Sequence, residues 1–258
     1  MQQVSIPTRE SAPAARDGTG YRFRRLSLPV VMDDMSFSSR DPAPGAPAPS
    51  FDLPTLDGGR FRSGDLDGSR PVLLVFGSMT CPMTDNAAPG LNALHRRFGP
   101  HVRFVMVAVR EAHPGSVIRQ PQTFEEKRRH AGRLRDLHGI PFEIAVDDAD
   151  GTLHRALSPK PNSAYLLGKG GVILFRAHWA NDSAALAEAL AAVAAGEPLR
   201  RTQSLKMAGP MLRMLPNLAP ALDRAGKGAW ADMWRVMPPL AAAALVCKTL
   251  RIRPRARG

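Results

Sequence analysis

The sequence predicts a three-layer α/β domain, in which a central mixed sheet is flanked by helices, with an N-terminal hairpin and an extra α-helical C-terminal appendage. Apolar runs such as Val72–Phe76 alternate with stretches of helical character such as residues 82–98. Their order places parallel crossovers before an antiparallel strand pair. We expect a mostly disordered arm over residues 1–41, the α/β domain over 42–198, and a basic, Met- and Trp-rich helical extension over 199–258.

The arm is expected to be disordered because residues 1–41 are polar, rich in Arg, Ser and Pro, and show no sustained periodicity. After it, FDLPTL and GRFRS flank Asp57-Gly58-Gly59, which is a hairpin turn signal. The elements expected next, in chain order, are strand 72–76, helix 82–98, strand 103–109, helix 123–138, strand 142–147, helix 152–156, strands 163–167 and 172–176, and helix 182–195.

Local signals support these boundaries. The run VLLVF has the continuous apolar character of a strand buried on both faces. Pro82 suits the first turn of the following helix, and Pro89 inside it predicts a kink. Thr123 and Glu126 have the spacing of a capping box, and Gly196 ends the last helix of the domain.

The C-terminal extension carries two apolar helical stripes, each interrupted or bounded by prolines. The stripes are Met211, Met214, Leu215 and Leu218, then Trp230, Met233, Trp234 and Met237, and the prolines are Pro210, Pro216, Pro220, Pro238 and Pro239. Residues 201–258 hold eleven Lys and Arg and two Asp, a net charge of +9 (11 − 2), out of +12 for the whole chain. These helices either fold back over the domain, self-associate, or dock on a partner protein or an anionic membrane. No specific nucleic acid is expected, because the charge is confined to this segment.

The chain of 258 residues has only two cysteines, Cys81 and Cys247, far apart in the sequence. This excludes a disulfide scaffold and a cysteine-built zinc site. We expect no cofactor and no metal. The N-terminal residues have no apolar export segment, and VMPPLAAAALVC is too short to span a bilayer. We therefore expect a cytoplasmic protein.

The stretch FGSMTCPMT places Cys81 just after a buried strand, where a helix begins with Pro82. The free amides and the positive dipole end of a first helical turn stabilise a thiolate, so the position predicts a lowered pKa and a reactive thiol. Ser78 and Thr80 add hydroxyl donors nearby. The alternative is a small buried core residue, because free cysteine is often buried.

Three segments together resemble the thioredoxin-like superfamily, in its peroxiredoxin and redoxin branch: GAPAPSFDLPTLDG, PVLLVFGSMTCP, and Pro161 leading into NSAYLLGKGGVILFR. The resemblance covers about residues 42–196. It is closest to the iodothyronine deiodinase-like family, whose motif F-G-S-x-T-(Sec or Cys)-P is FGSMTCP here and whose E-A-H is found in VREAHPG.

The resemblance implies that Cys81 is the nucleophile, flanked by Glu111 and His113, with Pro161 as the cis-proline opposite it. The imidazole would exchange a proton with the thiol while the carboxylate fixes its tautomer. Because Glu111 and His113 lie two residues apart at a strand end, both are expected to face one side of the sheet. The alternatives are a solvent-facing turn histidine and a surface ion-pair partner.

The sequence also departs from the family patterns. Thr84 stands where thioredoxins have a second cysteine, Leu74 stands where peroxiredoxins have a proline, and the second histidine of deiodinases is missing. A sulfenate at Cys81 would therefore need an external thiol or Cys247 as the resolving group. Cys247 is alternatively a packing residue of its helix.

The leading hypothesis is a cysteine-based oxidoreductase that reduces a peroxide, a disulfide or a halogenated small molecule and is recycled by thioredoxin or a low-molecular-weight thiol. A second hypothesis is a catalytically idle module whose basic C-terminal helices dock a partner or a membrane. A third is a Cu(I) site formed by Met79, Cys81, Met83 and His113, which are soft ligand types.

Overall fold

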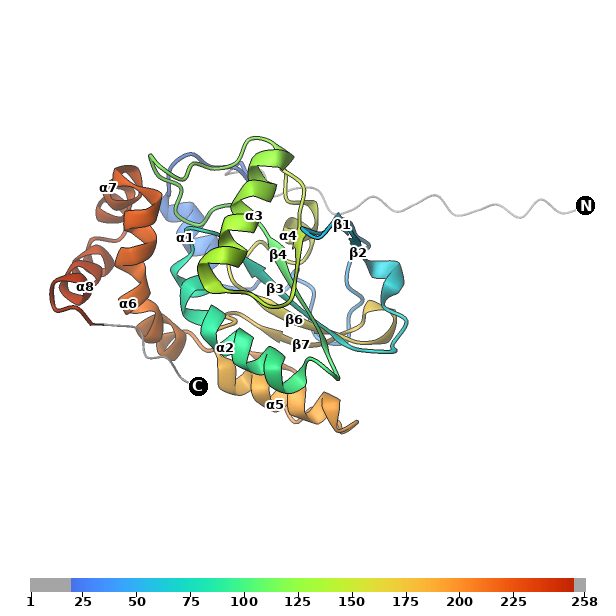
Figure 1. Cartoon of the computed structure of the whole chain (residues 1–258). Coiled ribbons are helices and arrows are strands. Elements are labelled where there is room, and N and C mark those ends of the chain that lie inside the picture. Colours follow the sequence, from blue (N-terminus) through green and yellow to red (C-terminus); the bar gives the residue numbers. More distant parts are fainter. Residues whose placement is uncertain (1–19, 253–258) are drawn as a thin grey trace, which may run out of the picture.

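The computed structural model describes residues 20–252, and Figure 1 shows their arrangement. A six-stranded mixed sheet forms the centre, in the order β5-β4-β3-β6-β7-β8. The central strand β3 is parallel to β4 and antiparallel to β6. The strands are β3 (Val72–Gly77), β4 (Arg103–Ala108), β5 (Glu143–Val146), β6 (Ala164–Leu167), β7 (Ile173–Ala177) and β8 (Gln203–Ser204).

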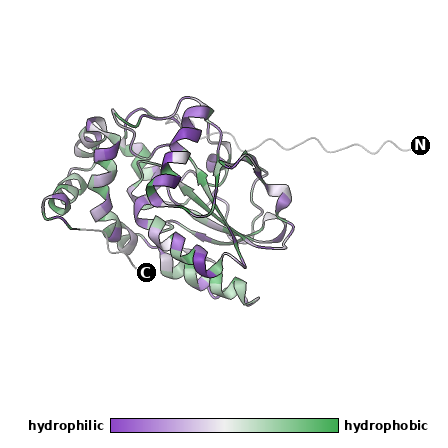
Figure 2. Cartoon of the chain, viewed as in Figure 1, coloured by the Kyte–Doolittle hydropathy of each residue, from purple (hydrophilic) through white to green (hydrophobic). Residues whose placement is uncertain are grey.

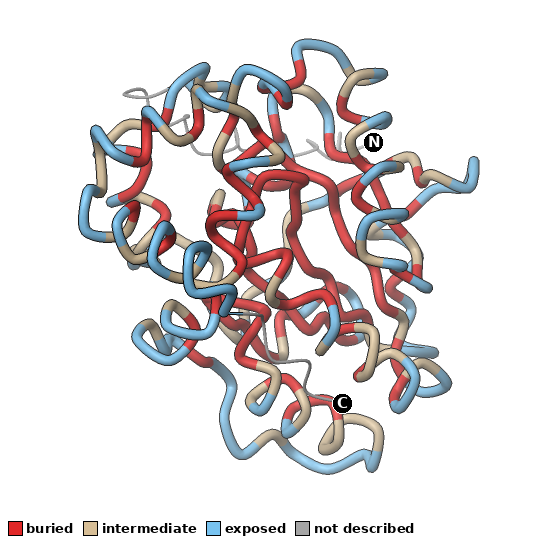
Figure 3. Tube along the Cα trace, turned by 60° about the vertical axis from the view of Figure 1, so that its left-hand side comes forward, coloured by how far each residue is buried: buried red, intermediate tan, exposed pale blue. Residues whose placement is uncertain are grey.

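Helices cover one face of this sheet, and a hairpin and a short helix cover the other. The first face packs on α2 (Pro82–Phe98), α3 (Phe124–His138) and α5 (Ser183–Ala194). The second face packs on the hairpin β1 (Asp52–Pro54) and β2 (Arg60–Arg62) and on α4 (Thr152–Ala156). Two short 3-10 turns are η1 (Ser63–Asp65) and η2 (Lys169–Gly171). Figure 3 shows the central strands as the most deeply buried part of the chain, so the predicted three-layer arrangement is confirmed.

The local signals act largely as expected. Helix α2 has the predicted bounds, with Pro82 in its first turn, and it continues through Pro89. The hydroxyl of Thr123 accepts a hydrogen bond from the amide of Glu126 at 3.2 Å and so caps α3. The Glu126 carboxylate, however, accepts from the amide of Gln122 rather than that of Thr123.

The prediction of disorder is wrong for residues 20–41, while residues 1–19 lie outside the described part. Helix α1 (Leu28–Asp34) begins with a proline in its first turn and buries Val30 and Val31. The hydroxyl of Tyr21 lies 2.9 Å from Nδ1 of His154. Apolar burial and this polar contact, both with distant parts of the chain, order a segment that has no periodicity of its own.

The domain also extends beyond the expected boundary at residue 198. Strand β8 pairs with β7 in parallel, with Ala177 opposite Ser204. A two-residue strand has no sequence signature, and it forms here because the free edge of β7 offers hydrogen-bonding groups.

The C-terminal helices are α6 (Ala208–Ala225), α7 (Lys227–Val236) and α8 (Pro238–Thr249). They fold back on the domain, and α6 packs on α2. The prolines do not break α6, contrary to expectation, because it continues through Pro216 and Pro220. Burial of its apolar stripe offsets the lost hydrogen bonds. The break before α8 falls at Met237, directly before the predicted Pro238-Pro239 boundary, whereas the break at Gly226 was not predicted.

We call α1 and α6–α8 together the helical cover. Its buried residues share one apolar cluster with Cys81, and these residues include Val31, Met214, Leu218 and Met233. In the described part of the chain, none of the helices combines the length and the apolarity that crossing a bilayer requires.

Candidate functional site

Cys81 lies at the junction that its sequence neighbours predict. Strand β3 ends at Gly77, and Cys81 is the N-cap residue of α2, directly before Pro82. The amide of Met83 and the amide and hydroxyl of Thr84 act to lower the pKa of its thiol, although the side chain forms no capping hydrogen bond to the helix. The first turn of α2 therefore faces the thiol as expected.

The predicted lowering of the thiol pKa is nevertheless wrong for this arrangement. Burial raises the pKa of Cys81 to about 12, and the neighbouring polar groups of Thr84 and Met83 act in the opposite direction without offsetting it. Only 1% of Cys81 is exposed. When a thiolate is out of contact with water, the free energy lost by its desolvation exceeds the stabilisation that a few neighbouring polar groups provide. In this closed form the thiol keeps its proton.

A small cavity of about 50 Å³ adjoins the thiol, and we call it the Cys81 cavity. The domain contributes Cys81, His113, Pro161 and Trp179 to its lining. The helical cover contributes mainly apolar side chains: Val31, Asp34, Met35, Met211, Met214, Leu218, Met233, Met237 and Leu240. The cover therefore closes the site with flexible, unbranched methionines, which adapt readily to a changing shape.

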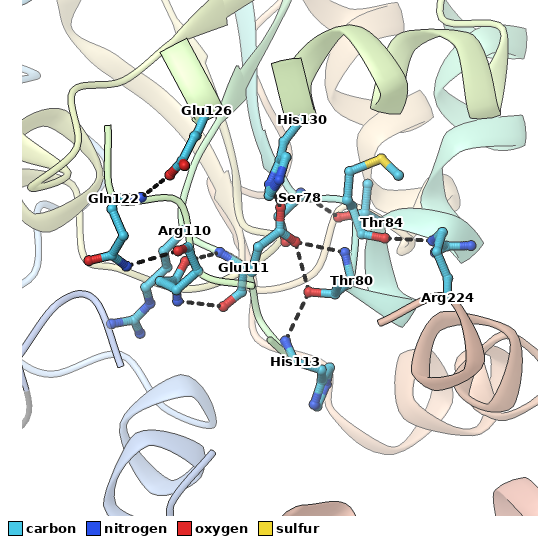
Figure 4. Close-up of polar contacts among 12 residues, drawn as sticks. Ser78, Thr80, Thr84, Arg110, Glu111, His113, Gln122, Glu126, His130 and Arg224 are labelled. Carbon is cyan, nitrogen blue, oxygen red and sulfur yellow. Dashed lines mark hydrogen bonds and ion pairs between the residues drawn. The ribbon is translucent and has the colours of Figure 1, made fainter. Parts of the chain in front are cut away.

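Glu111 organises the loop before Cys81. Its carboxylate accepts hydrogen bonds from the amide and the hydroxyl of Thr80, at 2.9 and 2.7 Å, and lies 2.8 Å from Nδ1 of His130 (Figure 4). The side chain of Gln120 bonds both the amide and the carbonyl of Glu111. Glu111 is thus a buried positioning residue.

His113 lies in the Cys81 cavity but is not oriented by Glu111, so this part of the expected arrangement is wrong. Figure 4 shows its ring pointing away from the Glu111 carboxylate. Strand β4 ends at Ala108, so both residues lie in a loop where the alternation of a strand does not apply. Burial lowers the pKa of His113 to about 4, and its buried Nδ1 has no hydrogen-bond partner. The neutral ring has a nitrogen free to exchange a proton.

Two residues near the site were not predicted from the sequence. Asp34 of α1 lines the Cys81 cavity, accepts a hydrogen bond from Arg110 at 3.2 Å, and has a pKa raised to about 7 by burial. His130 of α3 is the imidazole that contacts Glu111. Neither residue has a local motif, because both reach the site through packing of distant elements.

An ion pair fixes α6 against the thiol loop. Arg224 donates to both oxygens of Asp85, at 2.7 and 2.6 Å, and to the carbonyl of Met79 at 2.8 Å. Asp85 lies in the first turn of α2 and also contacts Nε2 of His138 at 3.0 Å. The helical cover is therefore hydrogen bonded to the loop that carries Cys81.

The other predicted residues lie close to the site, with one correction. Ser78 and Thr80 are buried in the loop. Pro161 lines the cavity, but residues 20–252 contain no cis peptide bond, so its expected cis form is wrong. Ser158, ahead of β6, has a left-handed backbone with φ of 79°.

The structure does not bring Cys247 or a metal site to Cys81. Both cysteines are free, and Cys247 lies on α8, outside the lining of the cavity. Cys81, Met83 and His113 line the same cavity, but Met79 packs in the core on the sheet side, so the structure does not bring all four proposed Cu(I) ligands together. Within residues 20–252 no group of three or more His, Cys, Asp or Glu is placed to hold a metal.

The model of the AhpC/TSA family matches residues 44–175, more than half of the chain. Among solved structures, a protein from Geobacillus kaustophilus is 20% identical, with 62% of this chain and 87% of that chain covered and a TM-score of 0.50. A protein from Sinorhizobium meliloti 1021 is 18% identical, with 66% and 91% covered and a TM-score of 0.50.

Peroxidoxin BcpB from Mycobacterium tuberculosis is 18% identical, with 60% of this chain and 97% of that chain covered and a TM-score of 0.45. No curated protein matches the chain. The fold class expected from the sequence, thioredoxin-like with added C-terminal helices, is confirmed.

Proposed function

This chain belongs to the AhpC/TSA family, and on that premise we propose that it is a thiol-dependent oxidoreductase whose nucleophile is Cys81. The observation that carries the proposal is the position of the thiol. Cys81 occupies the N-cap position of α2, where the polar groups of Met83 and Thr84 act to lower the pKa of its thiol, and the same cavity holds the unpartnered Nδ1 of His113.

We propose a hydroperoxide as the substrate. Once the helical cover has moved and water has reached both groups, the Cys81 thiol gives its proton to His113, and the thiolate attacks the terminal oxygen of the hydroperoxide. The O–O bond breaks, a sulfenic acid forms at Cys81, and the leaving oxygen takes the proton to give an alcohol or water. The sulfur loses two electrons and the peroxide gains them.

An external thiol completes the cycle. It attacks the sulfenic sulfur and releases water, leaving a mixed disulfide at Cys81. A second thiol then restores the Cys81 thiol and leaves as the disulfide of the reductant. An external reductant is favoured because Cys247 lies outside the cavity, and thioredoxin or a low-molecular-weight thiol fits this role.

The described arrangement is the resting, closed form of this cycle. A thiol with a pKa near 12 is protonated at neutral pH. Movement of the helical cover would admit water and substrate, remove much of the desolvation, and leave the amides of Met83 and Thr84 to stabilise the thiolate. Glu111 and Thr80 would hold the loop in place meanwhile.

The motifs FGSMTCP and EAH favour a second substrate class, an organohalogen, through their resemblance to the deiodinase-like family. Cys81 would attack the halogen, the carbon–halogen bond would break, and the carbon would take a proton. The same external thiols would then release halide from the sulfenyl halide. Halide release, measured beside peroxide consumption, distinguishes the two substrates.

Turnover tests the proposal. The full chain is incubated with hydrogen peroxide or cumene hydroperoxide and either dithiothreitol or a thioredoxin system, and peroxide loss is measured. We expect Cys81→Ser to abolish turnover and Cys247→Ser to retain it. Turnover that survives in Cys81→Ser, or that is absent with every peroxide and both reductants, would contradict the proposal.

A further inference from the structure

Helix α8 is apolar around its circumference from Pro238 to Cys247, before Lys248 and Thr249 in its last turn, although it lies at the edge of the molecule. Ala241 and Ala244 are buried against α6 and α7. The adjoining part of the circumference carries Ala242, Leu245 and Val246, all exposed. Figure 2 shows α8 in the green shades of hydrophobic residues at the end of the molecule farthest from the hairpin. A helix that is hydrophobic on all sides normally has a second partner.

Exposed apolar residues continue past the end of α8, and cations lie among them. Leu250 and Ile252 are exposed, and so are Arg251 and Lys248, whose ammonium is paired with the Asp223 carboxylate at 2.8 Å. The chain then continues with three more arginines, at positions 253, 255 and 257, which lie outside the described residues. We call Ala242, Leu245, Val246, Lys248, Leu250, Arg251 and Ile252 the α8 surface.

We propose that the α8 surface docks on an anionic phospholipid bilayer. Exposed aliphatic residues with adjacent cations are the chemistry that binds at the boundary of headgroups and acyl chains. Trp234 on the neighbouring α7 is also exposed, and tryptophan is favoured at that boundary. The proposal goes beyond the proposed oxidoreductase function and does not depend on Cys81 chemistry.

Size and charge favour a bilayer over a second copy of the chain. A stable protein interface usually takes roughly 20–30 residues from each side, whereas the α8 surface has seven. Residues 201–258 carry a net charge of +9 (11 − 2), so two copies placed face to face through this segment would repel each other. An anionic membrane needs only shallow insertion and is attracted by the same charge.

Flotation of the full-length protein with vesicles tests the proposal. One set of vesicles is pure phosphatidylcholine, and the other contains phosphatidylglycerol in addition. We expect the protein to bind the anionic vesicles and to bind the neutral ones only weakly. Binding to the anionic vesicles should fall as the salt concentration is raised. The protein is used reduced and without peroxide, so the outcome is independent of its redox activity.

Matched variants connect binding to the α8 surface. Leu245→Ser should weaken binding roughly fivefold, whereas Leu137→Ser on α3 should not, although the two leucines are similarly exposed, at 44% and 46%. Arg251→Gln should also weaken binding roughly fivefold, and Arg128→Gln, an exposed arginine on α3, should not. Circular dichroism confirms that each variant is folded.

Three outcomes would overturn the proposal. One is that the protein does not float with anionic vesicles at low salt. Another is that it floats equally well when Leu245 or Arg251 is replaced. The last is a stable dimer, seen by light scattering, that Leu245→Ser converts to a monomer, because this would assign the α8 surface to a second copy of the chain.

Discussion

Replacing Arg224 by glutamine is predicted to uncover Cys81 without unfolding the domain. Arg224 makes three hydrogen bonds to the thiol loop and α2, one to the carbonyl of Met79 and two to the carboxylate of Asp85. The Asp85 side chain is 5% exposed and that of Arg224 is 20% exposed. Breaking a fully buried ion pair costs roughly 3–5 kcal/mol. Because Arg224 is partly exposed, we expect its replacement to shift the free energy of opening of the cover by about 2 kcal/mol.

A change of about 2 kcal/mol in the opening equilibrium of the cover raises the open population about 30-fold. The rate of Cys81 alkylation by iodoacetamide at pH 8 should rise by that factor. When the cover opens and closes faster than the reagent reacts, the alkylation rate is proportional to the fraction of molecules in the open form. Peptide mass spectrometry separates Cys81 from Cys247.

The matched control for this variant is Arg103→Gln. Arg103 forms a similar two-oxygen pair with Glu143, but between β4 and β5, away from the cover. An unchanged alkylation rate in Arg224→Gln would refute the reasoning. An equal rise in Arg103→Gln would show that general unfolding, not movement of the cover, exposes the thiol.

Three further predictions concern individual side chains. Burial raises the pKa of Cys81 from 9.0 to about 12, so as pH rises the thiol ionises first in the unfolded chain, and folding stability is lost between about pH 9 and pH 12. Urea titrations at pH 8 and pH 10 should therefore show that the wild type loses about 1 kcal/mol more unfolding free energy than Cys81→Ser over this interval. His113→Gln should slow sulfenate formation at Cys81 by roughly 100-fold in stopped-flow measurements, and unchanged kinetics would exclude His113 as the base. Glu111→Gln should destabilise the protein by about 2 kcal/mol in urea, because the amide of the glutamine replaces an oxygen that accepts two hydrogen bonds from Thr80; an unchanged midpoint would show that these bonds contribute little.

The chemistry-bearing turn was predictable because its signals are local. A buried apolar strand, a cysteine and a proline at the first helical position specify the β3–α2 junction within about ten residues of sequence. The nearness of the amides of Met83 and Thr84 to the thiol follows from that junction alone. The central strands and α2, α3 and α5 were predictable for the same reason, since each carries its own periodicity.

The environment of the thiol was not predictable from the same residues. Its pKa depends on desolvation, and the groups that exclude water come from α1 and α6–α8, far away in the sequence. The stripes on α6 and α7 indicated a buried face but not what they bury against. The pairing of His130 with Glu111 likewise depends on how α3 packs, so the adjacent EAH motif pointed to His113 instead.

The most direct test of Cys81 as the redox centre is a single-turnover trapping experiment. The reduced protein is mixed with one equivalent of hydroperoxide and a sulfenate-selective dione, in both wild type and Arg224→Gln, and the modified peptide is identified by mass spectrometry. We expect one adduct, at Cys81, that forms faster in Arg224→Gln. An adduct found only at Cys247, or no adduct in either protein at the end of the incubation with peroxide, would contradict the assignment of Cys81 as the redox centre.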